Sequence, residues 1–356
     1  MGAKSYVVFV IVGMFIGQIV FFGCGTPSPP SVVRTYAEQR EPKQVPEPEK
    51  KKENNFNVEL MGRALGPGYF VCGVRVYGGY IYAAALESGL RVIDVSDPKK
   101  PQEMGFYDTP GDAIGVHVAG RYAYVADGKC GLHIIDVSDP KKPQEVGFCD
   151  TPGHAYRVDV VGNYAYVADR ESGLRVIDVS DPERPQEVGL YVTGDANEVC
   201  VAGSYAYVAD RESGLRVIDV SDPKRPQEVG VYDTPDRIGM SVYVSGGYAY
   251  VADWKSGLRI IDISNPRNPQ EVGFFDCNAA SVYVSGGLAY VAAWSIGLLA
   301  IDVSDPKRPQ LVGFYDTPGG ASEVSVTGGY AYVADYDAGL WILRYTGAAP
   351  TTKPAL

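Results

Sequence analysis

The chain has 356 residues, of which 46% are hydrophobic and 21% are charged, with 43 Asp and Glu against 32 Lys and Arg. The formal net charge of −11 argues against a nucleic-acid partner, because nucleic-acid binding depends on a positively charged surface. The length alone would allow two or three domains, but an internal repeat predicts that most of the chain forms one body.

Residues 1–23 are predicted to be a targeting segment. Lys4 precedes an uncharged stretch from Tyr6 to Phe22, and Cys24 follows Gly23. This order resembles a bacterial lipoprotein signal peptide, which implies that Cys24 becomes the acylated N-terminal residue. An uncleaved helical anchor and ordinary secretion are the alternatives. All three export the chain, so we expect an extracytoplasmic protein of the cell envelope, attached to the membrane by a lipid or a helix.

Residues 24–55 are predicted to be a linker that begins with the lipid-anchor cysteine. The stretch after Cys24 contains six prolines and mixed Glu and Lys residues, so it cannot bury a core and should be semi-extended. Residues 348–356 are predicted to be a disordered tail. The segment between them, residues 56–347, carries the repeat.

The repeat is the stretch Gly173-Leu-Arg-Val-Ile-Asp-Val-Ser-Asp-Pro182 and its relatives, which recur every 40 to 43 residues. A fixed period of this length is typical of propellers and solenoids. Seven copies therefore predict seven units. The copies begin at Gly89, Gly131, Gly173, Gly214, Gly257, Gly297 and Gly339.

Each unit contains four extended stretches. In the third unit they are Tyr156–Val161, Tyr164–Asp169, Leu174–Val179 and Gln186–Tyr191, all rich in Val, Ile and Tyr and separated by Gly, Asn, Ser, Asp and Pro. This pattern predicts short strands joined by turns. Four strands in about 42 residues is the size of a propeller blade.

The ring is predicted to close at its N-terminal end. The seventh copy ends with a third strand near Trp341–Tyr345 and has no fourth, whereas Val58–Ala64 precedes the first inner strand. We therefore expect Val58–Ala64 to complete the last blade and leave no broken edge. The predicted fold is an all-β, seven-bladed β-propeller of four-stranded antiparallel blades.

The repeated motifs Leu-x-Val-Ile-Asp-Val-Ser-Asp-Pro and Tyr-Ala-Tyr-Val-Ala-Asp resemble those of the LVIVD-repeat family of bacterial and archaeal cell-surface β-propellers. The resemblance covers about residues 56–345 and recurs in register. It implies this fold and an extracytoplasmic setting. It transfers no catalytic residue, since the family has none assigned.

One face of the predicted disc varies from blade to blade. The residues that follow the second strands are Leu86, Gly128, Arg170, Arg211, Trp254, Trp294 and Tyr336. Trp254, Trp294 and Tyr336 should form an aromatic arc on consecutive blades, beside the pair Arg170 and Arg211. Aromatic and Arg side chains are common interface anchors, and aromatic rings also stack on sugars; the alternative is that these rings only wedge between blades. Nearby loops add Tyr69, Phe70, His154, Asp195, Asn197, Asp236 and Arg237.

The inner strands supply a second group of candidates. Each has two repeated Val positions that flank a variable residue, and the variable residues should line the axis. They could form a pocket, or they could simply fill the axis together with water. The set is Arg75, His117, Asp159, Cys200, Tyr243, Tyr283 and Ser325.

No enzyme signature is present in the sequence. The three histidines have no metal-ligand spacing, and neither a Gly-x-Ser-x-Gly motif nor a phosphate-binding glycine loop occurs. The Asp residues that end the Tyr-Val-Ala-Asp strands precede turns, where a carboxylate caps backbone N–H groups. Neither a metal nor a cofactor is expected. The five cysteines after Cys24, which stand at different positions of the repeat, are expected to be small buried residues.

These features predict an exported, membrane-anchored, non-catalytic module that recognises a protein or glycan of the cell envelope through the variable face. A structural envelope scaffold is the first alternative. The second is a hydrolase or oxidoreductase with a site on the axis around His117, Asp159 and Arg75.

Overall fold

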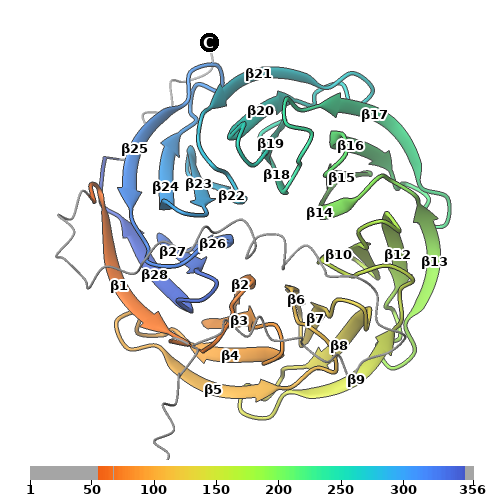
Figure 1. Cartoon of the computed structure of the whole chain (residues 1–356). Coiled ribbons are helices and arrows are strands. Elements are labelled where there is room, and N and C mark those ends of the chain that lie inside the picture. The colour runs from red at the N-terminus through yellow and green to blue at the C-terminus, as the bar shows by residue number, and fades with distance from the viewer. Residues whose placement is uncertain (1–54, 67, 349–356) are drawn as a thin grey trace, which may run out of the picture.

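The computed structural model describes residues 55–66 and 68–348. The predicted targeting segment, Cys24, all but the last residue of the predicted linker, and most of the predicted tail lie outside these residues. Within the described residues the chain forms 28 strands, arranged as seven four-stranded antiparallel sheets around a common axis (Figure 1). The predicted seven-bladed β-propeller is therefore confirmed.

The first three blades follow each other in chain order. Blade 1 contains β2 (Gly73–Tyr77), β3 (Tyr80–Ala84), β4 (Leu90–Asp94) and β5 (Gln102–Tyr107). Blade 2 contains β6 (Gly115–Ala119), β7 (Tyr122–Ala126), β8 (Leu132–Asp136) and β9 (Gln144–Cys149). Blade 3 contains β10 (Arg157–Val161), β11 (Tyr164–Ala168), β12 (Leu174–Asp178) and β13 (Gln186–Tyr191).

The next three blades repeat this order. Blade 4 contains β14 (Ala196–Ala202), β15 (Tyr205–Asp210), β16 (Gly214–Asp219) and β17 (Gln227–Asp233). Blade 5 contains β18 (Ser241–Ser245), β19 (Tyr248–Ala252), β20 (Leu258–Asp262) and β21 (Gln270–Phe275). Blade 6 contains β22 (Ser281–Ser285), β23 (Leu288–Ala293), β24 (Gly297–Asp302) and β25 (Gln310–Tyr315).

Blade 7 joins the two ends of the ring. Its inner strands are β26 (Glu323–Thr327), β27 (Tyr330–Ala334) and β28 (Leu340–Tyr345), and its outer strand is β1 (Val58–Ala64). The register runs from Val58 opposite Tyr345 to Ala64 opposite Leu340. In Figure 1 the orange β1 lies along the blue β28. The predicted closure is confirmed, with the predicted bounds of the closing strand.

The second strand of each blade explains how neighbouring blades pack. In β7 the alternation of a strand places Tyr124 on one face and Ala123 and Val125 on the other. Tyr124 packs against Ala165 and Val167 of β11 in the next blade. A large residue thus fills the space left by small ones, and repetition of this contact around the ring gives a densely packed core.

A buried carboxylate at the end of most second strands fixes the loop that enters the same blade. In blade 3, Asp169 accepts hydrogen bonds from Thr151 Oγ1 (2.6 Å) and from the backbone N–H of Gly153 (2.8 Å). Burial raises the pKa of Asp169 to about 6, although these hydrogen bonds oppose the shift. The same two contacts recur at Asp127 and Asp335. These Asp residues cap loops, as their position before a turn predicted.

The cysteines of the described residues are free thiols. Cys72 and Cys130 are buried, whereas Cys149, Cys200 and Cys277 are half-buried. Burial raises the pKa of the Cys72, Cys200 and Cys277 thiols to about 12. All three are therefore neutral at physiological pH. The expectation of small buried residues holds for Cys72 and Cys130, whereas the other three cysteines are partly exposed.

Candidate functional site

On the variable face, the residue that follows the second strand links its blade to the next. Leu86, Gly128 and Trp254 form isolated antiparallel bridges to Ala113, Ala155 and Ala279, and Arg170, Trp294 and Tyr336 make the equivalent bridges. All six have a positive φ, which is 45° at Trp254, 26° at Trp294 and 41° at Tyr336. Gly128 adopts this conformation without strain, whereas a bulky side chain does so at a cost. Such strain is a pointer to function when large aromatic residues carry it.

The predicted aromatic arc is present. The ring centroids of Trp254 and Trp294 lie 6.0 Å apart, and those of Trp294 and Tyr336 lie 5.8 Å apart. Phe70, which is 45% exposed, extends the arc, because its ring centroid lies 5.2 Å from that of Tyr336. The two Trp rings and Tyr336 are half-buried, so they are neither fully wedged between blades nor fully open to solvent.

Arg170 and Arg211 are tied together by one carboxylate. Arg170 Nη1 lies 2.6 Å from Asn197 Oδ1 and 3.1 Å from Asp195 Oδ1. Arg211 Nη1 lies 3.8 Å from the other oxygen of Asp195, and Asn197 Nδ2 donates to the carbonyl of Met240. The predicted Arg pair therefore belongs to a buried polar network across blades 3 to 5.

His154, Tyr69 and Arg237 occupy three different environments. The imidazole of His154 covers Gly128, whose missing side chain leaves room for it. Burial and the nearby Arg170 lower the pKa of His154 to about 4, so the ring is neutral at pH 7. The guanidinium of Arg91 lies over the ring of Tyr69, 5.4 Å from the ring centroid. Arg237 is exposed and forms an ion pair with Asp233. None of the three lines a cavity on the axis.

Behind the aromatic arc, two cavities follow one another along the axis. The upper one has a volume of about 40 Å³ and an aromatic and apolar wall. It is lined by Cys72, Tyr156, Arg157, Asn197, Glu198, Met240, Trp254, Ala280, Ser281, Trp294, Ser322 and Tyr336. The lower one has a volume of about 110 Å³ and a mostly polar wall. Glu198 and Ser281 line both cavities, so the two are neighbours across these residues.

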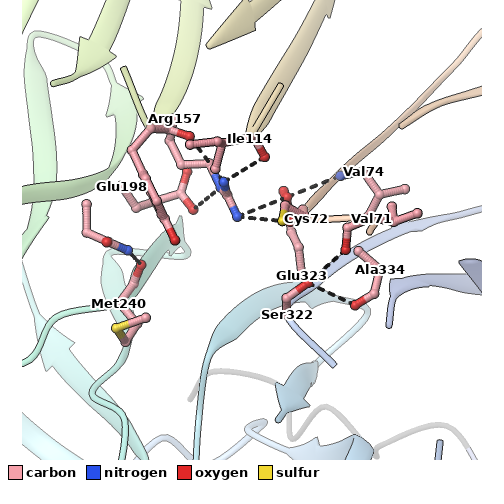
Figure 2. Close-up of polar contacts among 12 residues, drawn as sticks. Val71, Cys72, Val74, Ile114, Arg157, Glu198, Met240, Ser322, Glu323 and Ala334 are labelled. Carbon is pink, nitrogen blue, oxygen red and sulfur yellow. Dashed lines mark hydrogen bonds and ion pairs between the residues drawn. The ribbon is translucent and has the colours of Figure 1, made fainter. Parts of the chain in front are cut away.

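The polar residues in the lining of the upper cavity form its floor, and Arg157 is one of them. Figure 2 shows the polar contacts that Arg157 makes. Its guanidinium donates to the backbone carbonyls of Ile114 (2.9 Å) and Cys72 (3.1 Å), which belong to blades 2 and 1. Gly73 and Gly115 stand at the equivalent positions of these two blades, and a Cβ on Gly115 would lie 3.1 Å from Arg157 Cδ. The missing side chain of Gly115 thus makes room for Arg157.

Two glutamates face the Arg157 guanidinium, one from the neighbouring blade 4 and one from blade 7. Glu198 Oε2 lies 3.5 Å from Nε, and Glu323 Oε2 lies 3.4 Å from Nη2 and also accepts the backbone N–H of Val74 at 3.1 Å. Burial raises the pKa of Glu198 to about 8, because Arg157 offsets only part of the desolvation and Glu323 adds repulsion. Burial also raises the pKa of Glu323, whereas the two carboxylates hold the pKa of Arg157 above its usual value despite burial.

The predicted axial residues lie one layer deeper. Arg75, Asp159, Tyr243 and Tyr283 line the lower cavity, and the two Tyr ring centroids are 4.5 Å apart. Asp159 Oδ2 accepts the backbone N–H of Val201 at 2.7 Å. His117 Nδ1 lies 3.1 Å from the other oxygen of Asp159, although His117 is not itself part of the cavity wall.

The charge of Asp159 is set by opposing effects. Burial raises the pKa of its carboxyl, but the His117 contact, the Val201 N–H and the nearby Arg75 more than compensate, so the pKa is lowered. Asp159 is therefore ionised at pH 7, whereas Glu198 in the same cavity keeps its proton. The structure thus places His117 and Arg75 near Asp159.

The sequence analysis missed the layer that contains Arg157, Glu198 and Glu323. These residues stand two positions before the variable axial residues of the same strands, so they point to the same side. The signal was available: the layer reads Gly73, Gly115, Arg157, Glu198, Ser241, Ser281 and Glu323 when the strands are aligned by their pairing. Two glycines beside an Arg and two Glu residues would have indicated an ion cluster.

Over the part of the chain that the structure describes, no group of three or more His, Cys, Asp or Glu side chains could hold a metal ion. Among the same residues, no helix has the length and apolar character needed to cross a bilayer.

Comparisons with known proteins agree with this architecture. A search of curated proteins gave no match. The β-propeller domain of Myceliophteria thermophila Cps50 (Swd1) is similar in structure, with a TM-score of 0.66 and 12% identity over 81% of this chain and 99% of that one. The computationally designed Ika8 protein gives a TM-score of 0.61 at 8% identity, over 80% of this chain and 99% of its own. At these identities the likeness shows the fold alone.

The family model described as the LVIVD repeat matches the chain seven times, and its segments follow the blades. The last match is the shortest, since β1 supplies the fourth strand of blade 7. The matches are residues 68–109, 110–151, 152–193, 193–234, 236–277, 276–317 and 318–343. The chain therefore belongs to the LVIVD-repeat family.

Proposed function

We propose that the chain is an exported, membrane-anchored recognition module that binds a protein or glycan of the cell envelope at the variable face of its propeller. The observation that carries this proposal is the aromatic arc of Trp254, Trp294 and Tyr336, which rims a cavity with a polar floor. Half-buried aromatic rings around a concave site with a few convergent polar groups are typical of ligand sites.

The opposite face supports the assignment by contrast. Its turns repeat the same local contacts, as in the backbone N–H of Ser180, which donates to Asp178 Oδ1 at 2.9 Å. Equivalent bonds occur at Ser96, Ser138, Ser221, Ser264 and Ser304. A face that repeats one turn has its residues chosen by turn geometry, whereas the variable face carries residues that turn geometry does not require.

The test is a pull-down from envelope extracts and a glycan array, both with the full chain in mild detergent. The double variant Trp254→Ala/Trp294→Ala should lose the bound partner while its thermal melt stays close to that of the wild type. The matched control is Phe274→Ala, which removes a 50% exposed aromatic ring from the outer strand β21, away from the cavity. Partner binding that survives the double variant, or a melt that collapses with it, would favour the scaffold function instead.

A hydrolase with its site on the axis is a second candidate, and one observation favours it. Glu198 and Asp159 line the same cavity with pKa values shifted in opposite directions, as in acid–base pairs of enzymes. A hydrolytic activity that disappears in both Glu198→Gln and Asp159→Asn would support this candidate. A panel of ester, glycoside and phosphoester substrates that all remain intact would oppose it.

A further inference from the structure

We propose that the upper axial cavity binds an organic ammonium group on a short apolar stem, with Glu198 as the counter-ion. The inference rests on the proposed function and names the chemistry that the recognised partner presents.

The wall of the cavity suits such a group. Trp254, Trp294 and Tyr336 line the cavity, and Met240 and Ala280 add apolar surface to its wall. Aromatic faces attract cations through their quadrupole, and the attraction strengthens when the site is desolvated. The same surfaces bury the methylene groups of a stem, which is favourable by the hydrophobic effect.

The floor supplies acceptors for the N–H donors of a primary ammonium. Glu198 and the buried Ser281 stand where the upper cavity meets the lower one. Arg157 does not hold Glu198 in a bidentate ion pair, since the contact is a single one of 3.5 Å between Glu198 Oε2 and Arg157 Nε. Arg157 instead directs its short bonds at the carbonyls of Ile114, Tyr156 and Cys72, at 2.9 to 3.1 Å.

The charges around Glu198 leave room for one more cation. The charged groups that act on it are the guanidinium groups of Arg157 and Arg75 and the carboxyl groups of Glu323 and Asp159. Together with Glu198 there are three carboxyl groups and two guanidinium groups. Burial raises the pKa of Glu198 to about 8, since Arg157 and Arg75 offset only part of the desolvation and Glu323 and Asp159 add repulsion, so the carboxyl is mostly protonated at pH 7. A ligand ammonium that takes the place of this proton would compensate the carboxylate.

Other ligand classes fit less well. An anion would face Glu198, and the nearest guanidinium already donates to backbone carbonyls. A metal ion lacks a cluster of ligands within the described residues. The cavity volume of about 40 Å³ corresponds to roughly three water positions, which suits the end of an alkylammonium chain and not a whole sugar ring.

The experiment uses the full chain and three probes of the same shape: n-butylamine, n-butanol and butyrate. Binding is followed at pH 7 by tryptophan fluorescence and by calorimetry, since two of the three tryptophans, Trp254 and Trp294, line the cavity. We expect saturable binding of n-butylamine and at least tenfold weaker binding of the alcohol and the carboxylate. Calorimetry in buffers of different ionisation enthalpy should show release of close to one proton per bound amine.

Two variants sharpen the test. Glu198→Gln keeps the shape of the protonated carboxyl, so it should fold normally, bind n-butylamine at least tenfold more weakly and abolish proton release. Glu171→Gln, which removes an exposed carboxylate from the turn after β11, should leave both quantities unchanged. Equal affinity for the amine and the alcohol, or unchanged amine binding in Glu198→Gln, would overturn the inference.

The two proposals fail in distinguishable ways. If n-butylamine does not bind but an envelope partner is lost with Trp254→Ala/Trp294→Ala, the ammonium chemistry is wrong and the recognition role stands. If n-butylamine binds through Glu198 but no partner depends on the two tryptophans, the site is real and the proposed envelope function is wrong.

Discussion

Replacement of Glu198 by Gln should make the protein less sensitive to alkaline pH. The carboxyl has a pKa of about 8 in the folded chain against 4.5 for the unperturbed group. Between these values the folded state binds a proton that the unfolded state releases. Folding stability from this group is therefore full below pH 4.5 and is lost as the pH rises to about 8. Gln has the shape of the neutral carboxyl and does not titrate, so the variant loses no folding stability over this pH range.

The size of the effect follows from the shift. Each pKa unit corresponds to about 1.4 kcal/mol, so the shift of Glu198 sets a ceiling of roughly 5 kcal/mol on the pH-dependent difference between variant and wild type. For a domain larger than 200 residues, about 1 kcal/mol changes the melting temperature by roughly 2 °C. We therefore expect Glu198→Gln to melt close to the wild type at pH 5 and up to about 10 °C higher at pH 9.

The assay is calorimetric melting of both proteins at unit steps from pH 5 to pH 9. Asp159→Asn is the matched control, because it lies on the same axis and its pKa is lowered. The stability from Asp159 is present above pH 3.8 and is lost as the pH falls through its folded pKa. Asp159→Asn should thus melt below the wild type at neutral pH, with a gap that shrinks on acidification. Parallel melting curves for Glu198→Gln and the wild type across the whole range would refute the reasoning.

Three further predictions concern the fold. Deletion of Val58–Ala64 should lower the melting temperature by more than 10 °C in calorimetry and cause aggregation, because it uncovers the β28 edge and the 4% exposed Trp341. Asp169→Ala should cost about 2–4 kcal/mol in urea unfolding, since Thr151 Oγ1 and the Gly153 N–H lose a buried acceptor. Gly115→Ala should cost about 2 kcal/mol in the same assay, because its Cβ would meet the Tyr156 carbonyl oxygen at 2.7 Å.

Each of these has an opposite outcome that would count against it. A deletion variant that melts cooperatively at the wild-type temperature would mean that β1 is not the closing strand. An Asp169→Ala variant as stable as the wild type would show that both acceptors of the cap are dispensable. For Gly115 the control is Gly66→Ala, where a Cβ meets nothing within 4 Å, and equal effects of the two changes would contradict the steric argument.

The variable-face site could be predicted only in part. The arc of Trp254, Trp294 and Tyr336 followed from the repeat, because equivalent positions of consecutive blades must lie side by side. The extension by Phe70 instead of Tyr69 did not, since a loop residue has no register to fix its direction. The two side chains are adjacent in sequence, yet one contacts Tyr336 and the other lies under Arg91.

For a related reason, the sequence analysis identified only one of the two layers of axial residues. The variable layer from Arg75 to Ser325 stood out because repeated Val residues flank it, whereas the layer two residues earlier lacks one of those markers. Arg157 reaches the carbonyls of blades 1 and 2 across Gly115, which has no side chain to block it. A long side chain and the space that admits it come from different blades, so no single repeat contains the information.

The sequence by itself determined the period, the four strands of each blade, the number of blades and the strand that closes the ring. These are local or periodic properties, which follow from turn residues, strand alternation and equivalence between repeats. Only the tertiary structure decided the cavities, the pairing of Arg157 with Glu198 and Glu323, and the raised pKa of Glu198. These depend on burial and on distances between residues of different blades, because both desolvation and Coulomb interaction are set by the packed interior.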